Sequence, residues 1–521
     1  MTTTLDRPES AGTDGPTVSA APKWQLAVAS FLPPERRASA LPWIARVPLA
    51  LILVMQAAFT LRLTNSAFRD EALYIWTGHR VIEHLLHGAV LYDNPTSYFS
   101  GSPFFYPVIA AVLDSVGGVT LVRLFSLVLM LAATVSVYSF AARLFGRRVG
   151  LVAAASFALA GPTMHLSNFA TFDALALSLI AVSIAIGARA IAKGSLWYIG
   201  VVGVLLSAAV LSKYAALMFV PFALAVMAFT PPRRTAAIRF AGLAAVMTAG
   251  VLTLLALTIS QAELAGLQTT TTNRSAIVET SAWTIATQAW RFVGPWYVVA
   301  VVGLVVCVVT RRQVLLPVLL LAATLAPAIY HMYIHESVSL DKHLDFGLVF
   351  AAPLIGLAAS VTRRTWQRLA VGVGAAWLVL SGLASSKFIY GEWANTKPLV
   401  DVMAYAFDSA PYIRTLGDVY EPARYHFQDT TEYWQWDTTD SIFYQDPERG
   451  DLQGLEAAKE GLHDRYWQYV YFDENSTGIS KQIAPLMSEY GYRLTDKVTL
   501  ANNAGDDVYD IWQNFDPPPT N

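Results

Sequence analysis

Three carboxylates and a lysine stand out in this sequence because of the segments in which they lie. Asp173 is isolated in NFATFDALALS, and Lys213 lies in LSAAVLSKYAALMF. Asp70 and Glu71 stand at the start of the mixed segment DEALYIWTGHRVIEHLLHG. Ionisable side chains are costly to bury in apolar surroundings, so such positions are candidates for function. A carboxylate can remove a proton as a general base, and a lysine can neutralise a phosphate.

Each of these residues also has an ordinary structural explanation. Asp173 or its neighbour Thr171 could cap the start of a helix. Acids such as Asp70 and Glu71 favour the first turn of a helix through the helix dipole. Lys213 could extend its side chain from an apolar stretch to the membrane interface. Topology favours function, because the spans given below bring Asp70, Asp173 and Lys213 to one face of a membrane.

A second polar group of residues lies in HMYIHESVSLDKHLD, at 331–345. His331 and His335 stand four residues apart, which could place both on one helical face toward a metal, but no zinc motif surrounds them. We therefore predict no metal site, and the need for a divalent cofactor stays open. Lys342 and His343 directly precede an apolar span and are candidates for binding a phosphate.

Two arginines lie in another predicted outer loop, at 260–292. Arg274 and Arg291 could contact a phosphate or a soluble acceptor. A solvated loop cation is the more ordinary reading of both, and Arg274 is kept as a candidate phosphate ligand.

The composition excludes an ordinary soluble domain. Of 521 residues, 55% are hydrophobic and 14% are charged, against about 25% charged in a soluble protein. Residues 1–386 hold 26 Lys and Arg against 15 Asp and Glu, whereas residues 387–521 hold 10 against 23. The single cysteine, Cys307, excludes a disulfide scaffold and a Cys-rich metal site. A basic membrane body with an acidic soluble tail is therefore expected.

The apolar segments predict an all-α polytopic membrane protein with about 11 transmembrane helices, since each span takes about 20 mostly apolar residues. The candidate spans are 43–62, 119–142, 149–165, 168–191, 196–213, 214–230, 240–259, 293–310, 313–331, 346–362 and 369–386. Arg-rich loops alternate along the chain and all fall on one side of this topology. Because Lys and Arg in short loops stay cytoplasmic, the N-terminus is predicted to be cytoplasmic.

Three regions follow. Residues 1–42 are predicted to be a disordered cytoplasmic tail without a signal peptide. Residues 43–386 form the transmembrane body, with a first outer loop at 63–118. Residues 387–521 form a small acidic extracytoplasmic α/β domain.

The outer regions have patterns of their own. Residues 71–88 predict an amphipathic helix in the outer interface that ends at Gly88. The segment SYFSGSPFFYPVIAAVL favours a turn into a second interfacial helix. In the tail, strands are predicted at 466–473, 493–500 and 506–513, and a helix at 480–490.

The sequence resembles the GT-C superfamily of polytopic glycosyltransferases that use polyprenyl-phosphate sugars, in particular its protein O-mannosyltransferase and lipid A aminoarabinose transferase branch, the glycosyltransferase family 39-like proteins. The resemblance rests on RDEALYIW, GSPFFYPVIAAV, the stretch from LVRLFSLVL to VAAASFAL, FATFDALAL and LSKYAALMFVPFAL, and covers about residues 45–230. It implies that Asp70, with Glu71 beside it, is the base or the acceptor-positioning group. It implies Asp173 as the second carboxylate and Lys213 as the phosphate ligand.

One departure from that branch concerns the metal. The aminoarabinose transferases have a Glu-Lys pair before a Pro-rich stretch, where this sequence reads YFSGSP at 98–103. This puts a metal site in doubt and shifts phosphate neutralisation towards Lys213 and Lys342.

The resemblance implies a multi-pass plasma-membrane enzyme that transfers a glycosyl group, with inversion, from a polyprenyl-phosphate sugar to a hydroxyl of a cell-envelope glycan, a lipid or a protein. A mannosyltransferase is one member of this class. No nucleic-acid partner is expected. A transporter or flippase of a lipid-linked sugar is an alternative, although no inverted repeat is visible in the hydropathy. A non-catalytic envelope assembly subunit is the other.

Overall fold

The protein is described by a computed structural model, which covers residues 46–91, 94–259, 279–310, 314–360, 364–409, 412–502 and 505–515, together with Gln261, Leu264, Ala265 and Gln268. The predicted tail at 1–42 and the candidate Arg274 lie outside the described residues. The chain divides into two compact units, Met1–Ile52 and Leu53–Asn521. The second unit contains the site.

Every predicted span overlaps with a helix in the described residues. The helices of the body are α3 Val47–Thr60, α4 Arg69–His87, α5 Tyr106–Phe145, α6 Arg147–Ala158, α7 Gly161–Leu166, α8 Phe172–Lys193, α9 Tyr198–Ser212, η2 Tyr214–Phe219, α10 Val220–Ala228, α11 Arg234–Ala256, α13 Ala282–Val309, α14 Leu315–Ile334, α15 Leu340–Ala358 and α16 Thr365–Gly391. The length and apolar composition of these helices indicate a multi-pass membrane protein.

Six helices among the described residues are long and apolar enough to cross a membrane, namely α5, α8, α11, α13, α14 and α16. Three shorter apolar helices accompany them, at Val47–Thr60, Tyr198–Ser212 and Tyr214–Ala228. The predicted span 149–165 is divided into α6 and α7, because Pro162 begins a new helix after the non-helical Ala160. The polytopic fold is confirmed, and the count of eleven spans stays a prediction.

Helix α5 joins an outer helix to a span. Its backbone is non-helical at Gly117 and Gly118, and Gly118 has a φ of +63°, which L side chains rarely adopt. The residues before this kink correspond to the predicted second interfacial helix. Helix α4 occupies the predicted amphipathic segment and ends at Gly88, with a φ of +68°. Both helices predicted within residues 63–118 are therefore present, and their position at the outer interface stays a prediction.

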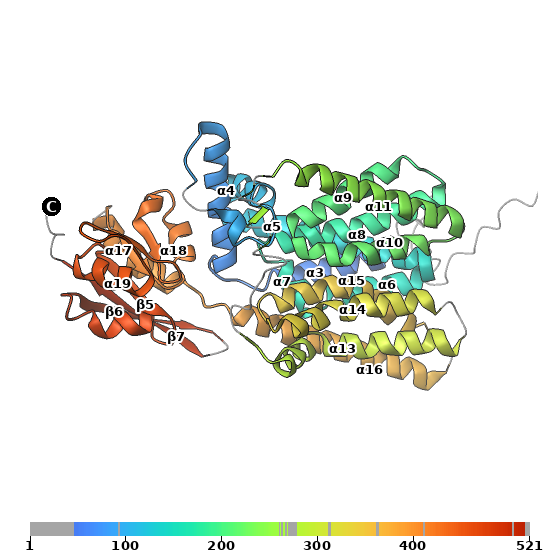
Figure 1. Cartoon of the computed structure of the whole chain (residues 1–521). Coiled ribbons are helices and arrows are strands. Elements are labelled where there is room, and N and C mark those ends of the chain that lie inside the picture. Colours follow the sequence, from blue (N-terminus) through green and yellow to red (C-terminus); the bar gives the residue numbers. More distant parts are fainter. Residues whose placement is uncertain are drawn as a thin grey trace, which may run out of the picture. The chain divides into compact units, whose positions relative to one another are not determined.

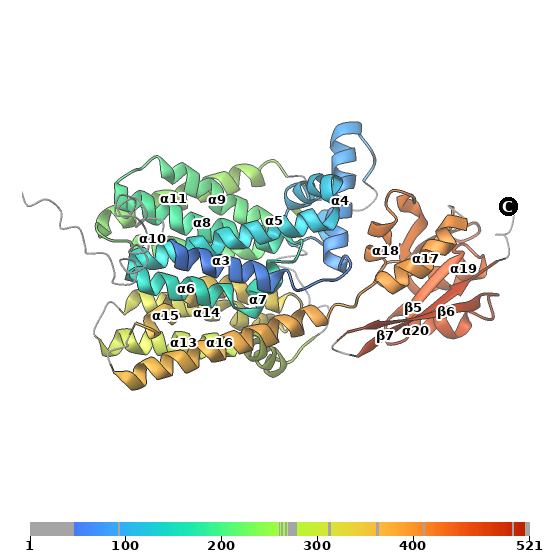
Figure 2. The same ribbon diagram turned by 180° about the vertical axis from the view of Figure 1, so that it is seen from behind.

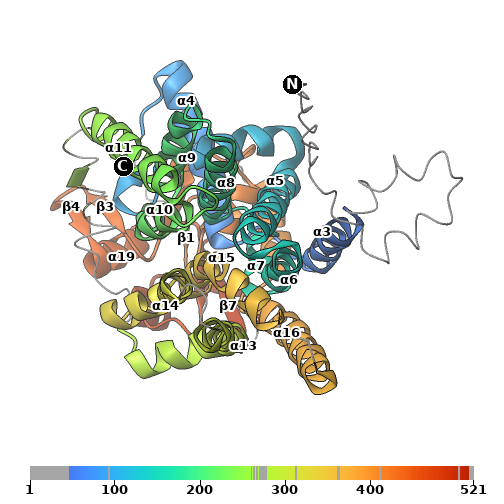
Figure 3. The ribbon, with the colours of Figure 1, turned by 90° about the vertical axis from the view of Figure 1, so that its right-hand side faces the viewer.

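The long helices of the second unit run side by side, as Figures 1 and 2 show from opposite directions. Figure 3 views them nearly end-on. Helix α15 is buried along nearly its whole length and packs against α13, α14 and α6. Helix α4 packs against α5. The first turns of α4 and α15 carry Asp70 and Lys342.

The C-terminal region contains a five-stranded sheet in the order β2-β1-β5-β7-β6 and a hairpin, β3-β4. Its elements are α17 Lys397–Ser409, β1 Thr415–Gly417, α18 Glu421–His426, η3 Tyr433–Gln435, β2 Trp436–Thr438, β3 Phe443–Asp446, β4 Gly450–Gln453, α19 Gly454–His463, β5 Tyr469–Asp473, α20 Ile479–Ile483, η4 Ala484–Leu486, β6 Arg493–Ala501 and β7 Asp506–Gln513. Strands β1, β2 and β5 are parallel, and β7 is antiparallel to β5 and β6. A small α/β domain is thus present where the sequence predicted one.

Candidate active site

The first ion pair of the site joins the outer loop to a late helix. Asp70 lies in the first turn of α4 and Lys342 in the first turn of α15, and Asp70 Oδ2 accepts a hydrogen bond of 2.5 Å from Lys342 Nζ. The Lys342 side chain is 8% exposed and that of Asp70 is 30% exposed. The ammonium also lies 4.9 Å from the centre of the Phe169 ring. Asp70 is therefore accessible, whereas Lys342 is nearly buried and its ammonium packs on the Phe169 ring.

The second ion pair is fully enclosed. Lys213 Nζ lies 3.1 Å from Asp173 Oδ1 and 4.7 Å from the centre of the Phe172 ring. Asp173 and Lys213 are 0% and 2% exposed. Thr171 caps α8 by accepting from the Asp173 amide, and its hydroxyl donates to the Asp173 carboxylate at 2.8 Å. The start of α8 is therefore capped as expected, and Asp173 also forms an ion pair with Lys213.

Lys213 is positioned by a close backbone contact with the first outer loop. Segment 100–102 makes two backbone hydrogen bonds, of 2.7 and 2.8 Å, with segment 211–214. A Cβ atom on Gly101 would lie 2.0 Å from the carbonyl oxygen of Ser212. Glycine is required here, because any side chain would push the Lys213 segment away. This contact accounts for Gly101 within the YFSGSP sequence.

The two pairs act on each other electrostatically. Burial alone would raise the pKa of Asp70, but the nearby charges of Lys342, Lys213 and Arg69 lower it below its ordinary value. The negative charge of Asp173, in turn, stabilises the charged form of Lys342. The structure thus brings together two carboxylates and two ammonium groups at the first turns of α4, α8 and α15 and the end of α9. Asp70 is ionised at neutral pH.

A cavity of about 360 Å³ opens beside the first pair. Its lining includes Asp70, Lys342 and Asp341, the cation Arg291, and the aromatic rings of Phe68 and Trp393. The two rings stack with centroids 4.0 Å apart. A site of this size with carboxylates, cations and an aromatic face suits a sugar, whose hydroxyls form hydrogen bonds and whose C–H faces pack on rings.

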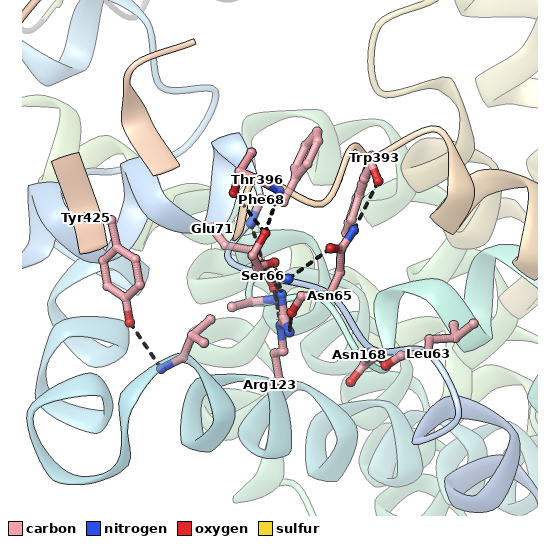
Figure 4. Close-up of polar contacts among 12 residues, drawn as sticks. Leu63, Asn65, Ser66, Phe68, Glu71, Arg123, Asn168, Trp393, Thr396 and Tyr425 are labelled. Atoms are coloured by element: carbon pink, nitrogen blue, oxygen red, sulfur yellow. Dashed lines mark hydrogen bonds and ion pairs between the residues drawn. The ribbon is translucent and has the colours of Figure 1, made fainter. Parts of the chain in front are cut away.

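Glu71 takes a different part from its neighbour. It is 0% exposed, and its carboxylate accepts two hydrogen bonds from Arg123, at 2.8 and 2.5 Å, and one each from the amides of Phe68 and Ala170. Arg123 also donates to the carbonyl oxygens of Asn65 and Ser66. Figure 4 shows this cluster, with Arg123 reaching up from α5. Its bonds tie the outer loop to α5 and to the segment before α8.

His343 does not join the two ion pairs through any described contact. Its Nδ1 lies 2.7 Å from Nε2 of His331, whose Nδ1 lies 2.5 Å from the carbonyl oxygen of Glu336. His331 and His335, whose spacing could place both on one helical face, do not share a helix, because α14 ends at Ile334. No group of three His, Cys, Asp or Glu suited to a metal occurs among the described residues.

Two further outcomes concern arginines. Arg291, predicted in an outer loop, lies within α13, because that helix begins eleven residues earlier than the predicted span. Arg123 was not singled out from the sequence. The signal was available, since an arginine in GGVTLVRLFSLV is an isolated charge in an apolar stretch. His165, in GPTMHLSN, was not singled out from the sequence either.

The C-terminal domain contacts the outer loop through several side chains, among them Arg69 and Tyr425. Arg69, next to Asp70, donates to Glu421 at 2.8 Å and to Asp440 at 2.6 Å. Tyr425 donates to Asp114 at 2.5 Å and accepts from an amide of α5 at its kink. The first contact fixes the start of the helix that carries Asp70.

Comparison with known proteins gives a family match over part of the chain and a fold match over about nine-tenths of it. Residues 102–260 match the family model described as dolichyl-phosphate-mannose-protein mannosyltransferase. A search of curated protein sequences gave no match. This family match includes Asp173, Lys213 and the Gly117–Gly118 kink.

Three solved structures share the fold. Apo ArnT from Cupriavidus metallidurans is 12% identical with a TM-score of 0.59, over 91% of this chain and 98% of that one. The same protein bound to undecaprenyl phosphate is 14% identical with a TM-score of 0.55, over 90% and 98%. The apo oligosaccharyltransferase from Archaeoglobus fulgidus is 12% identical with a TM-score of 0.54, over 91% and 75%.

These findings agree with the resemblance that the sequence predicted. The chain is a multi-pass membrane protein that shares the fold of these solved structures, and its residues 102–260 are similar to the mannosyltransferase family.

Proposed function

We propose that this protein transfers a glycosyl group from a polyprenyl-phosphate sugar to a hydroxyl acceptor at the outer face of the membrane, with inversion at the anomeric carbon. The observation that carries the proposal is the convergence of the Asp70–Lys342 and Asp173–Lys213 pairs from four distant helices. A lipid-linked donor cannot leave the bilayer, so its phosphate must be met at the membrane surface. Buried cations beside an accessible carboxylate meet that need.

Asp70 is the proposed base. It is ionised and accessible, and it lines the cavity that would hold the sugar. It removes the proton of the acceptor hydroxyl while the oxygen attacks the anomeric carbon from the side opposite the phosphate. The bond from that carbon to the phosphate oxygen breaks, and its electron pair leaves with polyprenyl phosphate.

Lys342 and Lys213 are the proposed phosphate ligands. In the described structure each faces a carboxylate, and a donor phosphate would compete for the same ammonium groups. Their positive charges stabilise the charge that grows on the leaving phosphate. Asp173 keeps Lys213 in place, and Arg274 and His343 stay as further candidates for the donor's anionic part.

Glu71 is proposed to position the site rather than to react. All the hydrogen bonds of its carboxylate go to Arg123 and to two backbone amides, and it has no exposed surface. We also propose that the N-terminus is cytoplasmic and the C-terminal domain extracytoplasmic, as the Arg-rich loops indicate. The acceptor is a cell-envelope glycan, a lipid or a protein hydroxyl.

Transfer of radiolabelled sugar from a polyprenyl-phosphate donor pool to endogenous acceptors, in membranes matched for expression, tests the proposal. Asp70→Asn should lose one labelled product with its fold intact. Glu83→Gln is the matched control, since this acid lies on the same helix, is 49% exposed and pairs with Arg80. Equal labelling in wild type and Asp70→Asn would favour a transporter or an assembly subunit instead.

A further inference from the structure

A buried histidine lies behind the cavity. His165, in α7, is 0% exposed, and its Nε2 makes no hydrogen bond with the described residues. Its Nδ1 lies 3.2 Å from Oδ2 of Asp341, whose side chain is 17% exposed and lines the cavity together with Asp70. The imidazole is held by the rings of Phe169 and Trp393. A buried polar group without hydrogen bonds is costly, so its retention calls for an explanation.

The fate of the proton released in the reaction explains why this histidine is retained. The transfer releases one proton from the acceptor hydroxyl, and the proposed function gives it first to Asp70. The lysine that keeps Asp70 ionised also makes it a poor place for that proton to remain, because a lowered pKa means a weak base. An imidazole, with an ordinary pKa of about 6.5, holds a proton better at neutral pH than an Asp with an ordinary pKa of about 3.9.

We propose that Asp341 and His165 form a proton relay that takes the acceptor's proton from Asp70 and stores it on the imidazole. The proton passes within the cavity from the Asp70 carboxyl to Asp341 and on to Nδ1 of His165, which restores the ion pair of Asp70 with Lys342. It returns to solvent through the cavity after product release. His165 acts through Asp341 and is a positioning residue. This inference rests on the proposed function.

The titratable groups with a described contact to the imidazole are Asp341 and Tyr390. Lys342, His343 and Asp345 lie with Asp341 on α15, which packs against α7. Arg123 is bound to Glu71, and Lys342 to Asp70. Thr163 donates to Asp345 at 2.5 Å. Asp341 is the only acid among the described residues with an ion-pair contact to His165.

The pH dependence of labelled-sugar transfer, measured from pH 5 to 8 in wild-type and His165→Gln membranes, tests the relay. Wild-type transfer should fall on the acid side, with a midpoint between pH 5 and 8, because an imidazole that already carries a proton cannot accept another. His165→Gln should lose about tenfold or more of the rate at pH 7 and should lose that midpoint. Asp341→Asn, which leaves the histidine in place, should lose the same midpoint.

Three results would overturn the relay. One is an unchanged pH profile in His165→Gln, whatever its rate. Another is an Asp341→Asn variant that keeps the wild-type midpoint. The third is a wild-type profile without a midpoint between pH 5 and 8. Failure of the proposed function is distinct, since Asp70→Asn would then label every product as wild type does.

Discussion

Asp70 Oδ2 and Lys342 Nζ lie 2.5 Å apart although 272 positions separate the two residues in the chain. The pair joins the first turn of α4 to the first turn of α15, so it forms only when the outer loop packs onto a late helix. Arg69 links the same turn of α4 to the C-terminal domain. The proposed base is therefore positioned by three separate regions of the sequence.

The charge of Lys342 should matter more to the reaction than to folding. Lys342→Met removes a cation from the proposed phosphate site, and the expected loss of transfer rate is about 10²- to 10³-fold. Binding of polyprenyl phosphate to the purified protein should weaken as well. Lys497→Met, in an exposed ion pair of the C-terminal domain, is the control. Retention of both transfer and binding in Lys342→Met would exclude the lysine from the phosphate site.

Glu71→Gln should destabilise the protein. The substitution leaves the guanidinium of Arg123 without its charge partner in a buried site, a change that typically costs about 3 to 5 kcal/mol. Thermal unfolding of the detergent-purified protein measures the effect, with Glu83→Gln as the control on the same helix. A Glu71→Gln variant as stable as wild type but without transfer would instead make Glu71 a reacting group.

Gly101→Ala should displace Lys213. The added methyl group would collide with the backbone at Ser212, so transfer should fall by up to about a hundredfold. Gly200→Ala is the matched control, since that glycine lies on α9, the helix that ends at Lys213, and faces open space. Equal loss in both variants would mean that the damage lies in the helix and not in the contact.

The C-terminal domain should influence the rate through Arg69. Glu421→Gln weakens the ion pair that holds the start of α4, and the expected result is a lower rate at saturating donor with little change in donor binding. Glu456→Gln, in an exposed pair with Arg449 on the same domain, should behave as wild type. Unchanged transfer by Glu421→Gln would show that this contact does not position Asp70.

Hydropathy predicted most of the fold, because a spanning helix must be apolar along its length. The same rule fails where helices break, as at Ala160, since composition does not reveal a change of direction. The long patterned strands β5, β6 and β7 were predicted, whereas β1 and β2 have three residues each and give no alternation to read.

The individual residues of the site were predicted from the sequence, but the ion pairs between them were not. Asp173 and Lys213 were chosen as isolated charges in apolar surroundings, Asp70 through the topology and the resemblance, and Lys342 because it precedes a span. No spacing tells which acid meets which lysine. Glu71 and Asp70 are neighbours with opposite environments, and successive residues of a helix point about 100° apart. The role of Arg123 depends on a contact 52 residues away in the chain.

The rate of labelled-sugar transfer by Asp70→Asn, measured alongside the polyprenyl phosphate bound by the same preparation, tests the central claim most directly. The account predicts that the donor lipid is still bound and that transfer is lost, while Lys213→Met loses both. An Asp70→Asn protein that transfers sugar at the wild-type rate would contradict the account.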